Sequence, residues 1–207
     1  MKIILTTTYF LILTVSIYAQ ANDEELIRTC FDRYRHFLLA ENGEEAIKFV
    51  DSHSIDYYGD LQELAKNADS LTIESLPIFD RVMVLTVRVM VPKEDILEFD
   101  GQSLLTYAIN NGMIGKQNQG SLMIGQVNVD QNSAQGKLLL DQIESPYSVH
   151  FNKENGEWKY DLTSLFPLAD SYIRKMTDEF GEKWMINAIV SAMAKENNKN
   201  NLWNPIK

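Results

Sequence analysis

The chain has 207 residues, of which 45% are hydrophobic and 23% are charged, and this is the composition of an ordinary globular protein. Its formal net charge at pH 7 is −10. An acidic chain without a basic stripe has nothing to exchange for the counterions of a phosphate backbone, so the composition argues against nucleic acid as a partner. The charge favours solubility and does not bear on the fold.

The first segment has the features of a secretory signal. Lys2 precedes an apolar run, and the segment closes on Ala19-Gln20-Ala21, which is a small-x-small cleavage pattern. We therefore expect residues 1–21 to be removed and the chain to be exported, either to the periplasm or to the medium. A signal that is retained as an anchor is the alternative. After cleavage we expect no membrane span, because no later segment is apolar enough.

Helical periodicity dominates the next part of the chain. Apolar residues recur at Leu26, Cys30 and Tyr34, which predicts a long helix that Gly43 stops. The stretch EEAIKFV predicts a short second helix, and SIDYYGDLQELAKNA predicts a third helix that Ser54 caps. Cys30 is the sole cysteine, so an intrachain disulfide is excluded, and its spacing predicts a buried helix residue.

Two stretches before the sheet region are harder to interpret. The valines of LPIFDRVMVLTVRVMVP favour a strand, but both of its faces are apolar and alternation does not decide between strand and helix. The stretch KEDILEFDGQSLLTYAINNG predicts two helical pieces, broken at Asp100-Gly101 and ended by Gly112.

Strand patterns follow from about Gly120 onward. Turn signals separate them at Asp130 to Ser133, Ser145-Pro146 and Asn155-Gly156, which predicts a meander of antiparallel strands. From Thr163 the period is helical again, and Gly181 marks a bend between two helices. The order is helices, then a curved antiparallel sheet, then a C-terminal helix, and this is the α+β class.

The last hairpin has a register that its turn defines. An Asn-Gly turn at residues 155–156 places Phe151 opposite Tyr160 and His150 opposite Asp161. The aromatic pair then belongs to the buried face, and the His–Asp pair points to the outer face. The His–Asp pair is compatible with an acid–base site or with a surface cross-strand pair, and its outward position favours the second interpretation.

In this order the elements resemble the nuclear-transport-factor-like superfamily, whose bent sheet wraps around a long N-terminal helix in a cone. AENGEEAIKFVDSHSIDYYGDL resembles the opening helices, with their paired aromatics. LPIFDRVMVLTVRVMVP followed by FDGQSLLTYAINNGMIG resembles a helical insert that some bacterial members carry before the sheet. SAQGKLLLDQ and VHFNKENGEWKYDLTSLFP resemble the closing strands.

The resemblance covers about residues 24–168 and gives the chain its expected organisation. Residues 22–168 are expected to form the nuclear-transport-factor-like domain. Residues 169–207 are expected to form a C-terminal helical extension with a loose tail. On this resemblance we predict a helix over residues 78–91, against the local preference for a strand.

The resemblance also implies a ligand cavity on the concave face of the sheet, lined here by Phe151 and Tyr160. Tyr57, Tyr58 and Tyr107 are candidates to add hydroxyls to this otherwise apolar interior, which suits a small amphipathic ligand. The alternative is that these tyrosines are core residues whose hydroxyls reach the surface or a backbone carbonyl.

No motif assigns a reaction. His36, His53 and Cys30 do not have the spacing of a zinc site, and the chain has no glycine-rich phosphate loop and no nucleophile elbow. We therefore expect no metal site, no cofactor and no catalytic residue.

Two functions of different classes remain. The first is an exported non-enzymatic domain that binds a small apolar ligand or a protein partner, with a homodimer through the sheet as an expected assembly. The second is a small-molecule hydrolase or isomerase that uses the tyrosine-lined cavity and a carboxylate. Only the second requires an ionisable side chain with a perturbed pKa inside the cavity.

Overall fold

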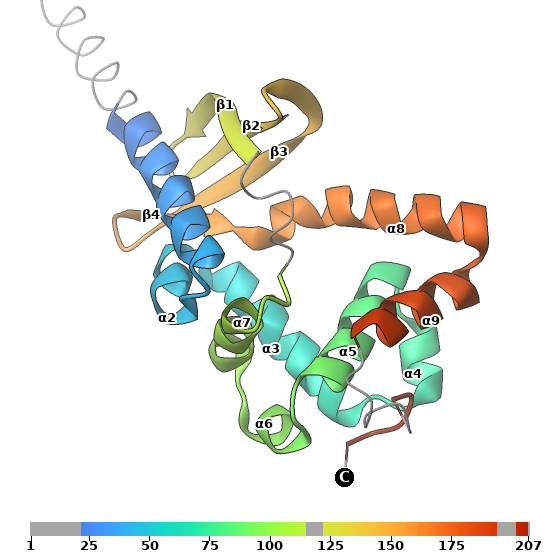
Figure 1. Cartoon of the computed structure of the whole chain (residues 1–207). Coiled ribbons are helices and arrows are strands. Elements are labelled where there is room, and N and C mark those ends of the chain that lie inside the picture. Colours follow the sequence, from blue (N-terminus) through green and yellow to red (C-terminus); the bar gives the residue numbers. More distant parts are fainter. Residues whose placement is uncertain (1–21, 115–121, 194–201, 207) are drawn as a thin grey trace, which may run out of the picture.

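The structure, a computed structural model, describes residues 22–114, 122–193 and 202–206. The fold is α+β, with helices first and the sheet later in the chain (Figure 1). The expected signal, residues 1–21, lies outside the described residues. Within the described ranges, no helix combines the length and the apolarity that a membrane crossing requires.

The first described helix spans residues 22–39 and lies across the sheet (Figure 1). Its periodicity correctly predicts the burial of Cys30 and Tyr34. The same periodicity is wrong for Leu26, which is 45% exposed, because the neighbouring Ile27 takes the core position and is fully buried. Burial raises the pKa of the Cys30 thiol to about 12, and a thiol that stays protonated is inert.

Two short helical turns and one long helix follow. They are α2 (Gly43–Ala46), the 3-10 helix η1 (Ile47–Phe49) and α3 (Ser52–Asn67). The predicted cap of α3 is wrong, because Asp51 rather than Ser54 occupies the N-cap position. Its carboxylate accepts a hydrogen bond from the Ser54 backbone N–H at 2.9 Å.

A set of helices between α3 and the sheet forms the insert. Its members are α4 (Ser70–Ser75), α5 (Ile78–Met90), α6 (Lys93–Glu98) and α7 (Gly101–Asn110). The helix predicted over residues 78–91 is confirmed. Apolar side chains occupy all of its faces because neighbouring elements cover most of its surface. The break at Asp100 is also confirmed, and Asp100 caps α7.

The sheet is an open antiparallel meander in the order β1-β2-β3-β4, as predicted. The strands are β1 (Leu122–Asp130), β2 (Ser133–Leu140), β3 (Ile143–Glu154) and β4 (Glu157–Asp161). The turn predicted at Ser145-Pro146 is wrong. The chain turns at Asp141-Gln142, where both φ angles are positive, at 50° and 67°. Pro146 lies inside β3 where the register to β2 shifts, so no ladder hydrogen bond is lost.

The register predicted for the last hairpin is confirmed: Phe151 pairs with Tyr160 and His150 with Asp161. The N-terminal helix packs on the aromatic face of this hairpin. The Phe31 ring meets the Tyr160 ring edge-on at 5.3 Å between centroids, and the Tyr34 ring does so at 5.2 Å. The face of the sheet that the N-terminal helix covers is therefore filled by aromatic side chains at this point.

The C-terminal part contains the 3-10 helix η3 (Leu162–Leu165), α8 (Phe166–Phe180) and α9 (Glu182–Met193). Figure 1 shows α8 running away from the sheet and α9 turning back onto α5. The bend predicted at Gly181 is confirmed, with a φ of 84°. The boundary expected after residue 168 falls within α8. Part of the tail is docked, since the Ile206 N–H donates to the Lys66 carbonyl at 2.9 Å.

Candidate functional site

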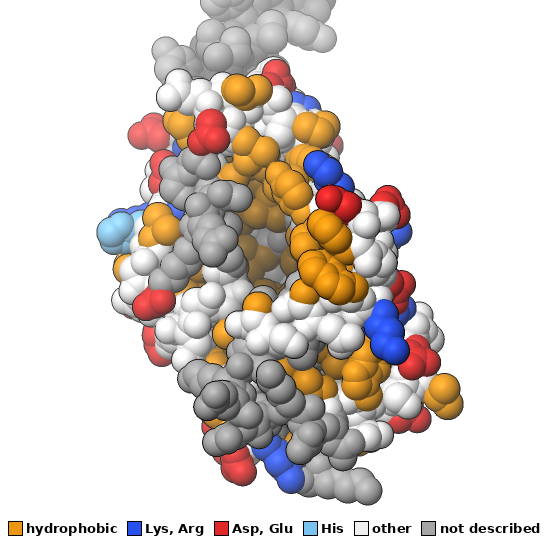
Figure 2. All heavy atoms as spheres, turned by 45° about the vertical axis from the view of Figure 1, so that its right-hand side comes forward, with side chains coloured by type: hydrophobic (Ala, Val, Ile, Leu, Met, Phe, Trp, Pro, Cys, Tyr) orange, Lys and Arg blue, Asp and Glu red, His pale blue; other side chains and the backbone are white. Residues whose placement is uncertain are grey.

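A partly open apolar cavity of about 30 Å³ lies between α3, α5 and α7. Two of its lining side chains carry hydroxyls, Tyr58 and Thr86, and the others are apolar. The apolar members are Leu61, Met83, Val87, Leu104, Ala108, Met113 and Ile114. Figure 2 shows a hollow on the side of the molecule that carries α8 and α9, with hydrophobic side chains on its walls.

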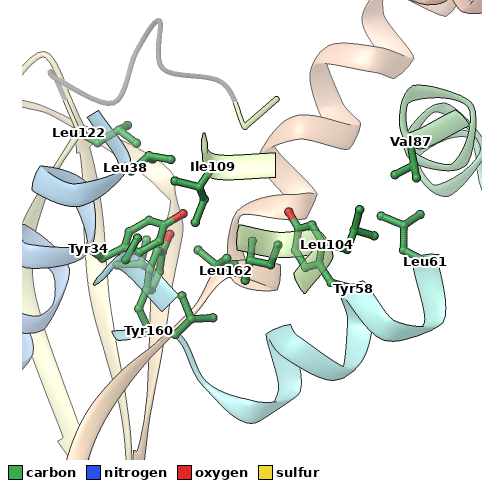
Figure 3. Close-up of a cluster of buried hydrophobic side chains, with 14 of the residues drawn as sticks. Tyr34, Leu38, Tyr58, Leu61, Val87, Leu104, Ile109, Leu122, Tyr160 and Leu162 are labelled. Carbon is green, nitrogen blue, oxygen red and sulfur yellow. The ribbon is translucent and has the colours of Figure 1, made fainter. Parts of the chain in front are cut away.

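Tyr58, which lines the cavity, has two further buried tyrosines near it in the core. Tyr34 comes from the N-terminal helix, Tyr58 from α3 and Tyr160 from β4, and they are 1–4% exposed. Figure 3 shows the hydroxyls of Tyr34 and Tyr160 pointing toward the side on which Tyr58 lies, with Leu162 and Ile109 near the space between them. The site therefore combines an apolar wall with a group of hydroxyls.

The Tyr160 hydroxyl is fully buried and has no hydrogen-bond partner among the described residues. The Ser164 side chain lies close enough to lower the pKa of Tyr160 as a hydrogen-bonding neighbour, but no hydrogen bond of good geometry joins the two hydroxyls. The Ser164 hydroxyl already donates to the Asp161 carbonyl and accepts from the His150 N–H. A buried hydroxyl without a partner costs about 1–3 kcal/mol, so such a group requires a water or a ligand to satisfy it.

All three hydroxyls are held in the neutral form. Burial raises the pKa of Tyr34, Tyr58 and Tyr160 well above the ordinary value for tyrosine. For Tyr34 the neighbouring Tyr160 and Tyr58 raise the pKa further, and for Tyr160 the charge of Asp161 does so. At ordinary pH these groups donate and accept hydrogen bonds and do not act as bases.

The structure brings only some of the five predicted cavity residues together. Phe151 and Tyr160 pack on each other at 5.5 Å in the core, and Tyr58 lines the cavity. Tyr57 points elsewhere: its hydroxyl donates to Asp80 at 2.9 Å. The Tyr107 hydroxyl donates to the Met90 carbonyl at 3.3 Å. Tyr57 and Tyr107 thus have the partners expected of structural tyrosines.

Asp161 is on the opposite side of β4 from Tyr160, but it does not face solvent as predicted. It is 8% exposed because the start of α3 and the turn into η3 cover it. The imidazole that approaches it is that of His53, with 3.7 Å between Nδ1 and Oδ1, rather than that of its strand partner His150. The surface His–Asp pair expected across the hairpin is therefore replaced by a contact with α3.

Asp51, His53 and Asp161 have ligand atoms within 4.8 Å of one another, which is a spacing that one metal ion can span. The two carboxylates already serve as helix caps. Asp51 accepts from the Ser54 N–H and from the Asn152 amide at 2.7 Å, and Asp161 accepts from the Thr163 N–H at 2.9 Å. The positive ends of two helical segments point at this site and disfavour a bound cation. The hydrogen bonds of the two carboxylates explain the cluster as a structural link between α3 and the last hairpin.

Arg88 is a buried charged residue that the sequence pattern did not single out. It lies in α5 and is 4% exposed, and its guanidinium donates to backbone carbonyls at the end of α3. The distances are 2.6 Å to Ala65, 2.6 Å to Ala68 and 2.8 Å to the carbonyl of Leu202 in the tail. A cation at a helix C-terminus satisfies carbonyls that have no helical partner. The signal in the sequence was a single charge inside an otherwise apolar run.

Tyr34 was also missed as a site residue. Its spacing predicted burial correctly, but periodicity does not show where a hydroxyl points. Its partners come from β4 and α3, and only the tertiary fold brings these elements together.

Comparison with known proteins adds no homologue: no family model, curated protein or solved structure matches this chain.

Proposed function

We propose that this chain is an exported, non-enzymatic binding domain for a small ligand with an apolar body and one hydrogen-bonding group. The apolar body would enter from the hollow and lie against the lining of the cavity between α3, α5 and α7. The polar group would bind the tyrosine hydroxyls at the inner end. The observation that carries this proposal is the unpartnered, buried hydroxyl of Tyr160.

The chemistry of the cavity supports an apolar ligand, and its small volume limits how much of that ligand can enter. A volume of about 30 Å³ accommodates only the end of a molecule, so the rest of the ligand would lie in the hollow outside. Met83 and Met113 line the cavity, and flexible thioether side chains adapt to different apolar shapes.

A hydrolase or isomerase, the alternative function, has less support. The described lining of the cavity contains no carboxylate and no imidazole, and the raised pKa values of the tyrosines remove them as bases. Asp161, which an enzyme would need as its strand carboxylate, is engaged in capping η3. A binding function requires only the hydroxyls and the apolar wall.

Export and family membership belong to the same proposal. We propose that residues 1–21 are a cleaved signal and that the mature chain is periplasmic or secreted. We also propose membership of the nuclear-transport-factor-like superfamily, with the cone shape that it implies. The support is the order of elements, with a long first helix lying on an antiparallel meander and a helical insert between them.

Two isosteric probes test the binding proposal, p-cresol and p-xylene, which differ by a hydroxyl in place of a methyl group. We expect the mature chain to bind p-cresol about 2- to 10-fold more tightly than p-xylene, as one neutral hydrogen bond predicts. Ligand-observed NMR titration measures both affinities. In Tyr160→Phe the preference for p-cresol should disappear, and in the matched control Tyr172→Phe, on the exposed part of α8, it should persist.

A second pair of variants tests the location. Met83→Lys puts a charge into the lining of the cavity, and we expect it to weaken both probes at least tenfold. Leu71→Lys replaces a 74%-exposed apolar residue on α4 and should leave both affinities unchanged. The proposal fails if neither probe binds, if the preference for p-cresol survives Tyr160→Phe, or if the two lysine variants behave alike.

A further inference from the structure

Within the described part of the chain, the apolar face of α8 is largely uncovered over its distal half. This 15-residue helix has no buried residue, although its hydrophobic side chains follow one stripe. Its first turn is anchored by Phe166, whose ring lies 4.7 Å from the rings of both Tyr57 and Phe79. Further along, Tyr172 is 57% exposed, Met176 37% and Phe180 49%.

The row of exposed hydrophobic side chains continues past the bend at Gly181 into α9. Phe180 packs against Trp184 at 4.7 Å, and Trp184 is itself 52% exposed. Four large hydrophobic side chains in one row form an exposed patch of the kind that marks an interaction surface. Hereafter this row, Tyr172, Met176, Phe180 and Trp184, is the α8 stripe.

We propose that the α8 stripe is a dimer interface, in which a second copy of this chain places its own α8 antiparallel to the first. The two-fold axis passes beside Met176, so Met176 meets Met176 of the second copy. Tyr172 then lies beside Phe180 of the second copy, and the same contact occurs twice, as the symmetry of such an interface requires.

Charge complementarity favours this occupant. At about 100° per residue, Lys175 and Glu179 lie on the same flank of the stripe, and both are exposed. In the antiparallel pair, Lys175 comes next to Glu179 of the second copy, and the reverse contact follows by symmetry. Exposed ion pairs contribute little affinity, but they select the antiparallel arrangement over the parallel one.

Other occupants fit this surface less well. The net charge of −10 disfavours an anionic lipid surface. A homodimer through the sheet stays a prediction, but Met123 and Ile143, the most exposed hydrophobic residues of its strands, do not form a continuous row. The dimer and the ligand site are tested by different variants, because Met83 lines the cavity whereas the α8 stripe comes from α8 and the start of α9.

Sedimentation velocity of the mature chain from about 1 μM to about 300 μM tests the proposal, because weak interfaces assemble in this range. We expect a reversible dimer. Met176→Lys places two like charges at the axis and should weaken the dimer at least tenfold. Leu71→Lys replaces an apolar residue elsewhere that is even more exposed than Met176, and it should leave the dimer unchanged, as should Ile143→Lys on the sheet.

A mixing experiment tests the antiparallel register. Lys175→Glu makes the flank entirely acidic and Glu179→Lys makes it entirely basic, so each variant alone should dimerise about 3- to 10-fold more weakly than the natural chain. An equimolar mixture of the two variants should recover the natural affinity, because each contact then joins opposite charges. A purely structural effect on one helix does not produce this recovery.

Several results would overturn the proposal. The first is a chain that stays monomeric at the highest concentration. The second is a dimer that Ile143→Lys dissociates and Met176→Lys does not. The third is a mixture of the two charge variants that does not recover the natural dimer affinity. A monomer whose co-sedimentation with phosphatidylcholine vesicles depends on Met176 would assign the stripe to a membrane surface instead.

Discussion

Tyr57 and Tyr160 show how differently two buried tyrosines are used. The Tyr57 hydroxyl donates to the Asp80 carboxylate at 2.9 Å, and burial together with that charge raises its pKa. The Tyr160 hydroxyl is more deeply buried and has no described partner. The same functional group therefore stabilises the fold at one position, whereas at the other it is the group that we propose binds a ligand.

This contrast predicts opposite effects of removing each hydroxyl. Tyr57→Phe should lower the free energy of unfolding by about 1–2 kcal/mol, because it breaks a hydrogen bond to a carboxylate. Tyr160→Phe should leave that free energy unchanged or raise it by up to about 1 kcal/mol, because it removes an unsatisfied polar group. Urea denaturation of both variants measures the difference. A Tyr160→Phe protein less stable than Tyr57→Phe would mean that the Tyr160 hydroxyl has a partner.

Asp23 gives the stability a pH dependence. Its pKa is lowered first by the hydrogen bond from Lys153 Nζ at 2.8 Å and then by the bond from Trp158 Nε1 at 2.8 Å. A carboxylate with a lowered pKa in the folded chain stabilises fully above its unfolded pKa, about 3.9. That stabilisation is lost as the pH falls through the folded value.

We therefore expect Asp23→Asn to lower the free energy of unfolding by about 1 kcal/mol at pH 7 and to have a much smaller effect at pH 2. Urea midpoints measured between pH 2 and pH 7 give both numbers. Lys153→Met keeps the bond from Trp158 and should produce a smaller loss at pH 7. An Asp23→Asn effect of equal size at both ends of the pH range would contradict this account.

At the scale of elements, the packing of α3 on α7 depends on one glycine. A Cβ at Gly101 would lie 2.2 Å from the Ile55 carbonyl oxygen and 2.7 Å from the Gly59 nitrogen. Both are backbone atoms, so the helices would have to move apart. Gly59, on the other side of the contact, has room for a Cβ, whose nearest neighbours are atoms of Gly101 at 3.9 Å.

We expect Gly101→Ala to destabilise the fold by about 2–3 kcal/mol, as overpacking of a core does. Gly59→Ala is the matched control, and it should be tolerated or should stabilise by up to about 1 kcal/mol, because alanine is the better helix former. Thermal unfolding of the two variants separates these outcomes. Equal losses would show that the close approach at Gly101 relaxes easily.

The sequence predicts most of the elements, and its errors have local causes. The Asn-Gly turn fixed the register of the last hairpin because this pair adopts the required positive φ angles. Asp141-Gln142 adopts them too, but it is a weaker signal than the nearby Ser145-Pro146, so the turn was placed four residues too late. The prediction of a helix at residues 78–91 was correct only because it followed the family resemblance, since the valines of this stretch favour a strand.

At the scale of the whole molecule, Arg88 joins three parts of the chain. It links α5 to the end of α3 and to the carbonyl of Leu202. Burial lowers its pKa, but a guanidinium remains charged at ordinary pH, so this link does not depend on pH.

Arg88→Met should lower the free energy of unfolding by about 3 kcal/mol or more, because it leaves several buried carbonyls without a donor. Arg88→Lys keeps the charge and should be intermediate, since an ammonium reaches fewer carbonyls than the planar guanidinium. Hydrogen exchange at the Ile206 amide, which bonds to Lys66, reports on the tail separately. If Arg88→Met leaves that amide protected, the tail is held without Arg88.

The candidate site could be predicted only in part from the sequence. Burial of Tyr58 and Tyr160 followed from helical and strand periodicity. Tyr57 was grouped with them because it is adjacent in sequence, yet its hydroxyl reaches Asp80 and its ring meets Phe166, at the start of a helix remote in the chain. Such partners are set by the tertiary arrangement, and no local pattern contains them.

The strand order β1-β2-β3-β4 also has a consequence for the rate of folding. Every strand pairs with its neighbour in the chain, so each hairpin closes a short loop at a small entropic cost and forms within microseconds. The aromatic core is different, because Phe31 must find Phe151 and Tyr160 across most of the chain. We therefore expect the slow step to be the arrival of the N-terminal helix on a sheet that already exists. A mutation at Phe31 should then slow folding, whereas mutations in the hairpin turns should mainly speed unfolding.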